Sequence, residues 1–257
     1  MTITAKNNKL IVLIKKLIDD RKYRYQTNLF VGETIRVIKS LLTSCNCQNL
    51  LVLDNNRNRQ LLKNINNDKL NVTFINEQIY KYISSLSNGD GFIGIFKMPK
   101  LDLDIASNKK YLILNKLQNQ TNLGLIIRSA CAFNIDGIFI TNQSVDVFHP
   151  DVIRYCMGNL SAIKIKCVTS LNDIIKPLKE HGYTVYATAI NNNSKELQSI
   201  KFANSSAILI GNEGNGNTNE DIKLCDEVVH IRINKNVDSL NVAIATSIIC
   251  YYLQSKY

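Results

Sequence analysis

An alternation of short apolar segments with helical ones, repeated through the second half of the chain, restricts the fold more than any other feature. Segments rich in Val, Ile and Leu predict strands at residues 111–115, 137–141, 162–168, 184–190, 207–211 and 228–233. Helical patterns fit residues 122–134, 150–158, 171–181, 219–225 and 239–254. Strands of this composition, each followed by a helix, favour a largely parallel sheet covered on both faces. Ligands of such sheets bind at the carboxyl ends of the strands, where the loops after 111–115, 207–211 and 228–233 fall.

The first part of the chain predicts a second, smaller α/β unit. Helical patterns fit residues 9–21, 57–66 and 78–87, strands fit 49–54, 71–76 and 91–96, and residues 29–42 fit a strand that runs into a helix. The segment 99–110 contains one Pro and charges of both signs, which is typical of a linker. We therefore expect one domain at residues 1–98 and another at 111–257.

Positive charge is concentrated in the first domain. The 257 residues carry 31 Lys and Arg against 21 Asp and Glu, a formal charge of +10. Residues 1–100 hold 16 basic and 7 acidic residues, whereas residues 101–257 hold 15 and 14. Such an asymmetry suits the capture of a polyanion, because each neutralised phosphate releases counterions. Charge alone does not separate RNA, DNA and an anionic membrane surface. Tyr23 and Tyr25 lie within the basic stretch and are candidates either for stacking on unpaired bases or for the core.

Other features of the composition exclude several classes of protein. No apolar run approaches the roughly 20 residues that cross a bilayer. The amphipathic first segment is interrupted by Lys15 and Lys16 and has no cleavage-like site. The seven Cys include no Cys-x-x-Cys pair and the three His lie far apart, so we expect reduced thiols and no metal site. We expect a soluble, cytoplasmic protein, with an organellar location left open.

Polar residues follow the predicted strands in three segments. In residues 122–130, Asn122 is placed to cap a helix, Gly124 permits close backbone approach, and Arg128 follows a turn and a half later. An ordinary capped helix with an Arg on its wet face also explains this segment. In residues 231–245, a strand passes through a polar turn into the last helix, with Ser239 as the expected N-cap. Packing explains the apolar stripe of that helix but not Asn241 in its first turn.

The remaining segment, residues 211–216, holds three Gly in six residues, which lets a backbone wrap a ligand. It matches neither a dinucleotide fingerprint nor a phosphate loop. Glu213 disfavours a phosphate and suits a cationic or hydroxyl-bearing ligand. A flexible hairpin is the alternative interpretation.

Together these segments resemble the motifs of the SpoU (TrmH-like) RNA ribose methyltransferases of the SPOUT class. The family's first motif, N-x-G-x-x-x-R-[ST]-A, is matched by Asn122, Gly124, Arg128, Ser129 and Ala130. The second, a strand followed by G-N-E-G-x-G, is matched by residues 211–216. The third, which contains I-P and S-L-N-V-x-x-A, is matched by Ile231, Ser239, Leu240, Asn241, Val242 and Ala245. Residues 144–158 are similar to the family's segment ending R-x-S-M-G, and residues 1–100 resemble more weakly a ribosomal-protein-like RNA-binding domain. The chain departs from these patterns in five respects. Arg232 replaces Pro, Asn236 replaces Gly and Cys156 replaces Ser; the stretch before Asn122 lacks the usual Asp-Pro, and residues 29–34 place Gly before Glu where the family has the reverse order.

The resemblance implies a trefoil-knotted, parallel-sheet domain that binds S-adenosylmethionine and forms a homodimer through its last helix. It implies cofactor contacts from Leu209, Ile210, Gly211, Asn212, Gly214, Ile231, Ile233, Ser239 and Leu240. The implied reaction is methyl transfer to a ribose 2'-hydroxyl of RNA, carried by Arg128, Asn122, Glu213, Ser239 and Asn241. We expect the RNA to contact Lys15, Lys16, Arg21, Lys22, Arg24 and Arg154.

The sequence leaves alternatives open for the role of Arg128, for the function of the protein and for the class of RNA. A guanidinium is a poor base, so Arg128 is either deprotonated in a special environment or stays charged and binds a phosphate while it orients the hydroxyl. The competing function is a non-catalytic RNA-binding or ribosome-assembly protein that keeps the fold, whereas a DNA- or protein-directed methyltransferase has support only from the charge. Among RNAs, the first domain favours large-subunit ribosomal RNA over transfer RNA, and the sequence identifies no nucleotide.

Overall fold

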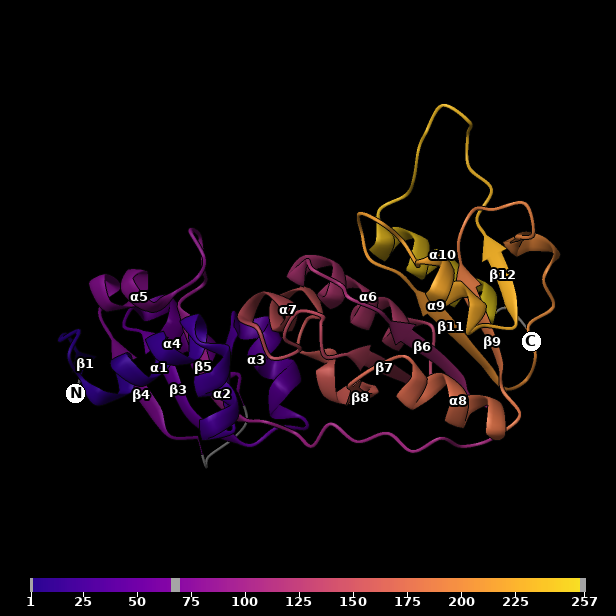
Figure 1. Ribbon diagram of the computed structural model, residues 1–257. Coiled ribbons are helices and arrows are strands. Elements are labelled where there is room, and N and C mark those ends of the chain that lie inside the picture. Colours follow the sequence, from indigo (N-terminus) through magenta and orange to yellow (C-terminus); the bar gives the residue numbers. More distant parts are fainter. Residues whose placement is uncertain (1, 66–69, 255–257) are drawn as a thin grey trace. The chain divides into compact units, whose positions relative to one another are not determined.

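The chain divides into two compact units in the computed structural model, which describes residues 2–65 and 70–254 (Figure 1). Unit 1 contains the residues up to Pro99 together with the segment Asp146–Ser161, and unit 2 contains Lys100–Val145 and the residues from Ala162 onward. This division differs from the expected one in two respects. Residues 146–161 group with the first unit, and most of the expected linker belongs to unit 2, where Leu103 is buried in the core.

Unit 1 is built on a mixed five-stranded sheet in the order β1-β4-β3-β5-β2. The strands are β1 (Thr2–Ile3), β2 (Leu29–Glu33), β3 (Cys47–Leu53), β4 (Val72–Ile75) and β5 (Phe92–Lys97). Strands β1, β4 and β3 are parallel, and β5 runs antiparallel to both β3 and β2. The helices of this unit are α1 (Lys9–Asp19), α2 (Arg21–Thr27), α3 (Ile35–Leu42), α4 (Asn56–Lys63), α5 (Glu77–Ile83) and α7 (Pro150–Tyr155).

The predicted helix at residues 9–21 is α1, which ends at Asp19, and the sequence did not predict α2, which begins at Arg21. Asp20 is extended (φ −121°, ψ 108°), which ends α1, and its carboxylate accepts a hydrogen bond from the Tyr23 N–H at the start of α2. The apolar stripe of α1, formed by Ile11, Ile14 and Leu17, packs with α5 and the strands in one buried cluster. The helical spacing therefore identified the buried face of α1 and its end within two residues, but not the short helix that follows.

Unit 2 confirms the predicted parallel sheet, which has seven strands in the order β10-β12-β9-β11-β6-β7-β8. The strands are β6 (Lys110–Leu114), β7 (Gly137–Thr141), β8 (Lys164–Val168), β9 (Thr184–Thr188), β10 (Lys195–Glu196), β11 (Ser206–Ile210) and β12 (Glu227–His230). The helices are α6 (Gln120–Ala132), α8 (Asn172–Glu180), α9 (Asn219–Lys223) and α10 (Val242–Gln254). The short strand β10 was not predicted, and two 3-10 turns, η1 (Asn159–Ala162) and η2 (Leu197–Ser199), complete the elements. None of the helices within the described ranges is long and apolar enough to cross a membrane.

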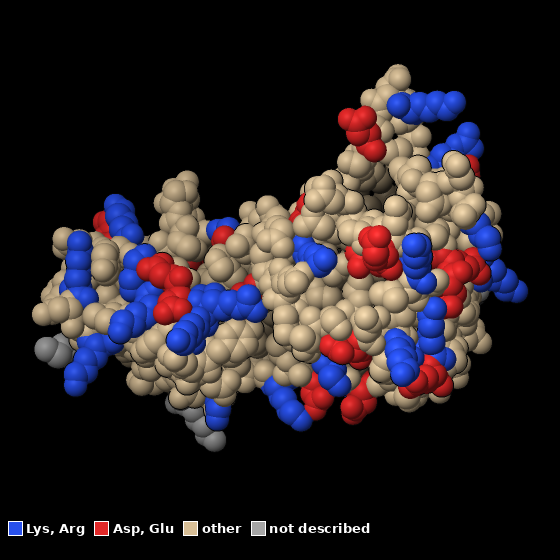
Figure 2. Space-filling model, viewed as in Figure 1, with Lys and Arg blue, Asp and Glu red and all other residues tan. Residues whose placement is uncertain are grey.

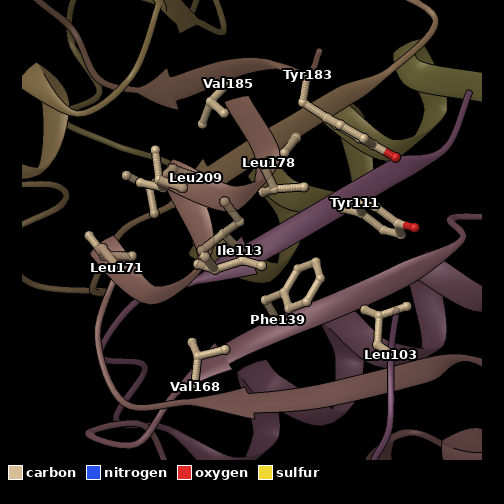
Figure 3. Close-up of a cluster of buried hydrophobic side chains, with 13 residues drawn as sticks. Leu103, Tyr111, Ile113, Phe139, Val168, Leu171, Leu178, Tyr183, Val185 and Leu209 are labelled. Carbon is tan, nitrogen blue, oxygen red and sulfur yellow. The ribbon is translucent and has the colours of Figure 1, made fainter. Parts of the chain in front are cut away.

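Helices cover both faces of the unit 2 sheet. On one face, α8 places Leu178 and its neighbours against Tyr111, Ile113, Phe139 and alternate residues of the other strands (Figure 3). On the other face, α6 and α10 lie together, joined by a hydrogen bond between the Ser129 and Ser247 hydroxyls. Strand β6 leads to β7 on one side and pairs with β11 on the other, so the strand order reverses between β6 and β11. Parallel sheets bind ligands at such a reversal, in the crevice outside the carboxyl ends of the strands.

Candidate active site

Glu213 joins the loop after β11 to the start of α6. Its Oε1 accepts hydrogen bonds from the Asn119 backbone N–H at 3.0 Å and from the Asn122 side-chain amide at 3.2 Å, and its Oε2 accepts from the Gln118 N–H at 3.0 Å. Two of these donors are backbone N–H groups at and just before the N-cap of α6, where a carboxylate also meets the positive end of the helix dipole. The predicted loops after β6 and β11 therefore contact each other. This follows from the pairing of β6 with β11 as parallel neighbours, which places both loops at the same edge of the sheet.

The hydrogen bonds keep Glu213 in its ionised form. Burial by itself raises the pKa of this carboxyl, but bonds from the Gln118 N–H, its own backbone N–H, the Asn122 amide and the Asn119 N–H together lower the pKa below its ordinary value. The site therefore holds a fixed negative charge at neutral pH, within the glycine-rich loop.

Asn241 brings the third predicted loop to the same place. Its side-chain amide donates to Asn122 Oδ1 at 3.0 Å, and its own Oδ1 accepts from the backbone N–H groups of Ala243 and Ile244. Asn241 is therefore the residue that caps α10, and the prediction that Ser239 is the cap is wrong. The chain stays irregular after β12 and enters its helix only at Val242.

The capping role predicted for Asn122 is also wrong. Asn119 caps α6, because its side chain accepts the Asn122 backbone N–H, and this frees the Asn122 side chain to bridge Glu213 and Asn241. Asn122 is almost fully buried, so its amide is fixed between these two partners. One chain of hydrogen bonds, Glu213–Asn122–Asn241, thus connects all three loops.

Two of the predicted catalytic residues lie outside this chain of hydrogen bonds. Arg128 is exposed on α6, six residues beyond Asn122 and so on a different side of the helix. No hydrogen bond or ion pair joins its guanidinium to another residue within the described ranges. Ser239 is exposed in the loop before α10 and lines the neighbouring cavity.

A cavity of about 250 Å³ adjoins Glu213 at the carboxyl ends of β9, β11 and β12. Its lining includes eight of the nine residues predicted to hold a cofactor: Ile210, Gly211, Asn212, Gly214, Ile231, Ile233, Ser239 and Leu240. The walls combine apolar side chains from α10 and the strands with the backbone of the glycine-rich loop. This composition suits a ligand with one apolar or planar part and one polar part.

Gly211 is required by a close approach of two backbone segments. A Cβ at this position would lie 2.3 Å from the Gly216 carbonyl carbon and 2.4 Å from the Asn217 nitrogen. Asn212 and Gly216 also exchange backbone hydrogen bonds at 3.2 and 3.0 Å, which closes the loop into a narrow turn. The loop therefore forms a hydrogen-bonded turn that makes one wall of the cavity.

Leu209 is the exception among the predicted cofactor residues. Its side chain is buried in the α8-side core (Figure 3) and its carbonyl accepts hydrogen bonds from Thr188 Oγ1 and the Asn217 amide. Successive residues of a strand face opposite sides of the sheet, so Leu209 cannot share the environment of Ile210. Arg232, the residue in place of the family's Pro, does not line the cavity either; it is exposed and lies 3.7 Å from Glu196.

Several lining residues were not predicted. Thr188 is the last residue of β9, and Ala189 and Ile190 follow it. The sequence placed candidate loops after the neighbouring strands but not after this one. His230 precedes Ile231, and its Nδ1 is buried with no hydrogen-bond partner among the described residues. Four residues of α10 also line the cavity: Val242 and Ala245, which the sequence presented only as matches to the third motif, and Thr246 and Ile249, which it did not single out.

The predicted RNA-binding residues of unit 1 fall into two groups. Lys16, Arg21 and Lys22 are exposed, and Figure 2 shows basic side chains gathered over this unit. Lys16 and Arg21 lie over the rings of Tyr23 and Tyr25, at 5.3 and 5.9 Å from the ring centres. These exposed residues remain candidates for contact with a polyanion.

The second group is committed to contacts within unit 1. Arg24 is 2% exposed, and its guanidinium binds Asp146 at 2.6 Å and the carbonyl oxygens of Leu17 and Ile18, so its prediction as an RNA contact is wrong. Lys15 is half-buried and lies 3.4 Å from Asp19. Arg154 pairs with Asp151 at 2.6 Å and is 28% exposed.

Comparison with known proteins agrees with this arrangement. The family model of the SpoU rRNA methylases matches residues 109–251. The chain is 27% identical over 252 residues to RlmP of Bacillus subtilis, a 23S rRNA (guanosine(2553)-2'-O)-methyltransferase, with 98% of each chain covered. It is 26% identical to an AdoMet-bound rRNA methyltransferase from Sinorhizobium meliloti, with a TM-score of 0.83 over 98% of this chain and 96% of that one. AviRb from Streptomyces viridochromogenes, 21% identical, shares the fold with a TM-score of 0.81 over 95% and 97% of the two chains. The match to the family model confirms the resemblance found in the three motifs, and the chain belongs to the SpoU rRNA methylase family.

Proposed function

We propose that this protein transfers a methyl group from S-adenosylmethionine to a ribose 2'-hydroxyl of large-subunit ribosomal RNA. The observation that carries the proposal is the Glu213–Asn122–Asn241 chain of hydrogen bonds beside the cavity. It places a fixed carboxylate and two oriented amides next to a ligand-sized space. The family supports the type of chemistry, and full-length similarity to a 23S rRNA 2'-O-methyltransferase favours ribosomal RNA over transfer RNA.

The cavity fits S-adenosylmethionine on the chemistry of its walls. Ile210, Leu240 and Ile249 supply apolar surface for the adenine ring, and the backbone of the glycine-rich loop supplies polar groups for the rest of the molecule. Glu213 lines this space, and the lowered pKa of its carboxyl keeps it negatively charged, which suits a cation better than a phosphate. The Sinorhizobium meliloti relative has been seen with this cofactor bound.

The residues have separate tasks in the reaction. When bound, the cofactor supplies an already activated methyl group, so the protein mainly aligns the acceptor and handles one proton. Glu213 anchors the start of α6, and Asn122 and Asn241 hold their amides at fixed distances from it. Ser239 and Leu240 border the cavity from the loop before α10.

Arg128 meets the RNA in this proposal. It is exposed and has no hydrogen-bond or ion-pair partner within the described part of the chain, so its guanidinium is accessible to a phosphate. A charged guanidinium binds a phosphate through two parallel hydrogen bonds, which would orient the neighbouring 2'-hydroxyl. We favour this role over that of a base.

Unit 1 supplies the affinity for RNA in the same proposal. Its exposed Lys16, Arg21 and Lys22 form a basic surface that suits the phosphates of an RNA backbone. The 2'-hydroxyl then distinguishes RNA from DNA at the site of methylation.

We further propose that unit 2 is knotted and pairs with a second copy through α10. Ile244 and Tyr251, two turns apart on α10, are 55% and 56% exposed although both are large and apolar. Association of this face with its copy would bury both side chains.

The proposal is tested by calorimetric titration with S-adenosylmethionine together with a methyl-transfer assay on ribosomal RNA. We expect one cofactor site per chain in the wild type, and an Arg128→Ala variant that keeps its cofactor affinity but loses methyl transfer by about 100-fold or more. Arg128→Lys, which retains charge but not the planar fork, should lose less. A dimer that binds neither the cofactor nor S-adenosylhomocysteine, with or without RNA, would favour the non-catalytic RNA-binding alternative.

A further inference from the structure

A second cavity lies on the other side of the glycine-rich loop. Its volume is about 300 Å³, and its lining includes Asn115, Lys116, Gln118, Gln143, Thr218 and Asp221. These residues follow β6, β7 and β11, so the cavity lies where the strand order of the sheet reverses. Asn212 and Gly216 line both cavities and form a shared wall. We call the second one the polar cavity, because side chains with hydrogen-bonding groups dominate its lining.

Lys116 adopts an unusual backbone conformation in the polar cavity. Its φ of 56° lies in the left-handed region, which residues with a Cβ rarely adopt and glycine adopts freely. Three hydrogen bonds hold it there: its N–H donates to Thr141 Oγ1 at 3.0 Å, and its carbonyl accepts from the Gln118 and Asn212 amides at 3.1 and 2.8 Å. The surrounding loops therefore fix a strained position, and a lysine occupies it where a glycine would be the easier choice.

The ammonium group of Lys116 is not used by the fold. The side chain is exposed and has no hydrogen-bond or ion-pair partner within residues 2–65 and 70–254. The other charged residue of the lining, Asp221, accepts hydrogen bonds from the Asn115 amide at 3.2 Å and from the Thr218 N–H at 3.1 Å. Lys116 is thus the one uncommitted charge in a lining whose residues are all described.

We propose that the polar cavity binds the nucleotide adjacent to the one that is methylated, and that Lys116 contacts its phosphate. This inference rests on the proposed function and extends it to a second nucleotide site. Gln118 provides the connection, because it lines the polar cavity while its backbone N–H binds the Glu213 carboxylate of the first site at 3.0 Å. The polar cavity therefore adjoins the site of the proposed methyl transfer, and an RNA strand whose target ribose lies at that site can place its neighbouring nucleotide in the polar cavity.

The lining suits a nucleotide better than a simple anion. The Gln143 amide can donate to and accept from the edge of an unpaired base, and the Thr218 hydroxyl can donate to it. The Gln118 amide donates to the carbonyl oxygens of Lys116 and Gln143, which leaves its Oε1 to accept from the base. Their reading of the base would add sequence preference, whereas the lysine adds affinity that does not depend on sequence. The polar cavity is therefore the place in unit 2 from which the base next to the target is selected.

The decisive variant is Lys116→Gly, which removes the ammonium and also relieves the left-handed backbone. Lys116→Arg retains the charge, and Lys176→Ala is the matched control, since it removes an exposed ammonium from α8, which lines neither cavity. The probe is an unmodified transcript of Bacillus subtilis 23S rRNA. Binding is measured at several salt concentrations, and cofactor affinity is measured by calorimetry.

We expect Lys116→Gly to weaken RNA binding by roughly three- to tenfold and to reduce the slope of log K against log salt by about 1. Its KM for RNA should rise, its cofactor affinity should stay unchanged and its thermal stability should not fall. Lys116→Arg and Lys176→Ala should both bind RNA like the wild type. A Lys116→Gly variant with wild-type RNA affinity and salt slope would overturn the inference.

The binding measurement separates this inference from the proposed function. An active wild type whose salt slope is independent of Lys116 contradicts only the nucleotide site. A wild type that transfers no methyl group, but binds RNA with a slope that depends on Lys116, contradicts the methyl transfer and supports the phosphate contact.

Discussion

Protonation of the Glu213 carboxylate is coupled to unfolding of the protein. Its lowered pKa means that the folded protein binds a proton at this carboxyl less readily than the unfolded chain does. The stabilisation is therefore fully present above the ordinary glutamate pKa of about 4.3 and is lost as the pH falls through the lower pKa of the folded state. The same charge that shapes the site also holds the start of α6.

The pH dependence gives a prediction for Glu213→Gln. At pH 7 the wild type should be more stable than the variant, because Gln offers one acceptor oxygen where the carboxylate offers two to the N–H groups of Gln118 and Asn119. The difference should shrink as the pH falls below about 4.3. Urea unfolding of both proteins from pH 7 to pH 3 measures it, and a difference that grows toward acid pH would contradict the assignment.

Arg24 stabilises unit 1 through a buried ion pair. Its guanidinium and the Asp146 carboxylate are 2% and 4% exposed and lie 2.6 Å apart, with the Tyr25 hydroxyl as a further donor to the carboxylate. Arg24→Ala leaves the Asp146 charge buried and unpaired, so we expect a loss of about 3–5 kcal/mol in unfolding free energy. Arg21→Ala, on the same helix but exposed, should change stability by no more than about 0.5 kcal/mol. Equal effects of the two substitutions in denaturant titrations would refute the buried pair.

Among the elements, the glycine-rich loop after β11 makes the most specific demand on residue type. Gly211→Ala would place a Cβ 2.3 Å from the Gly216 backbone, so the turn must open or the strand must shift. We expect a loss of about 1–3 kcal/mol in stability and at least tenfold weaker binding of S-adenosylmethionine by calorimetry. Gly214→Ala meets only the Asn212 Oδ1 at 3.5 Å and should cost much less stability. A Gly211→Ala variant as stable as Gly214→Ala would show that the loop does not close in this way.

Local patterns predicted most of the elements that build the site. The strands before the three loops, and the helices α6 and α10 after two of them, follow from apolar periodicity within two or three residues of the observed ends. The Glu213–Asn122–Asn241 residues came from motif resemblance, and their hydrogen bonds follow from parallel strands that end on one edge.

What the sequence did not predict depends on contacts between distant residues. Asp146 lies 122 positions from Arg24, so the charge of Arg24 was indistinguishable from that of an exposed neighbour. The caps at Asn119 and Asn241 depend on where the chain turns into each helix, which competing Asn and Ser residues leave undetermined. Leu209 is different, because the two-residue period of a strand already separates it from Ile210.

At the scale of the whole molecule, the basic surface and the candidate active site belong to different units. Unit 1 carries exposed basic residues on a mixed sheet, and unit 2 carries both cavities at the carboxyl edge of a parallel sheet. Unit 1 is completed by residues 146–161, so the chain passes from unit 2 into unit 1 and back between β7 and β8. The two units therefore depend on each other for their chain connections as well as for the proposed function.

If unit 1 binds RNA and unit 2 holds the cofactor, charge reversal on unit 1 should affect RNA binding alone. Replacing Lys16, Arg21 and Lys22 with Glu should weaken RNA binding and reduce its salt slope by roughly one for each phosphate that these side chains no longer bind, with unchanged cofactor affinity. The matched control replaces Lys164, Lys176 and Lys201 of unit 2, which are also exposed. RNA binding is measured by filter retention at several salt concentrations. An equal loss in the control would mean that net charge, and not the surface of unit 1, captures the RNA.

The most direct test of methyl transfer to ribose is the chemical identity of the methylated nucleoside. The protein is incubated with methyl-labelled S-adenosylmethionine and unmodified 23S rRNA, and the RNA is then digested to nucleosides and resolved by mass spectrometry. We predict a 2'-O-methylated nucleoside formed by the wild type and absent with Arg128→Ala. Label found only on a base, or no label transferred by a protein that binds the cofactor and the RNA, would contradict ribose methylation as the function of this protein.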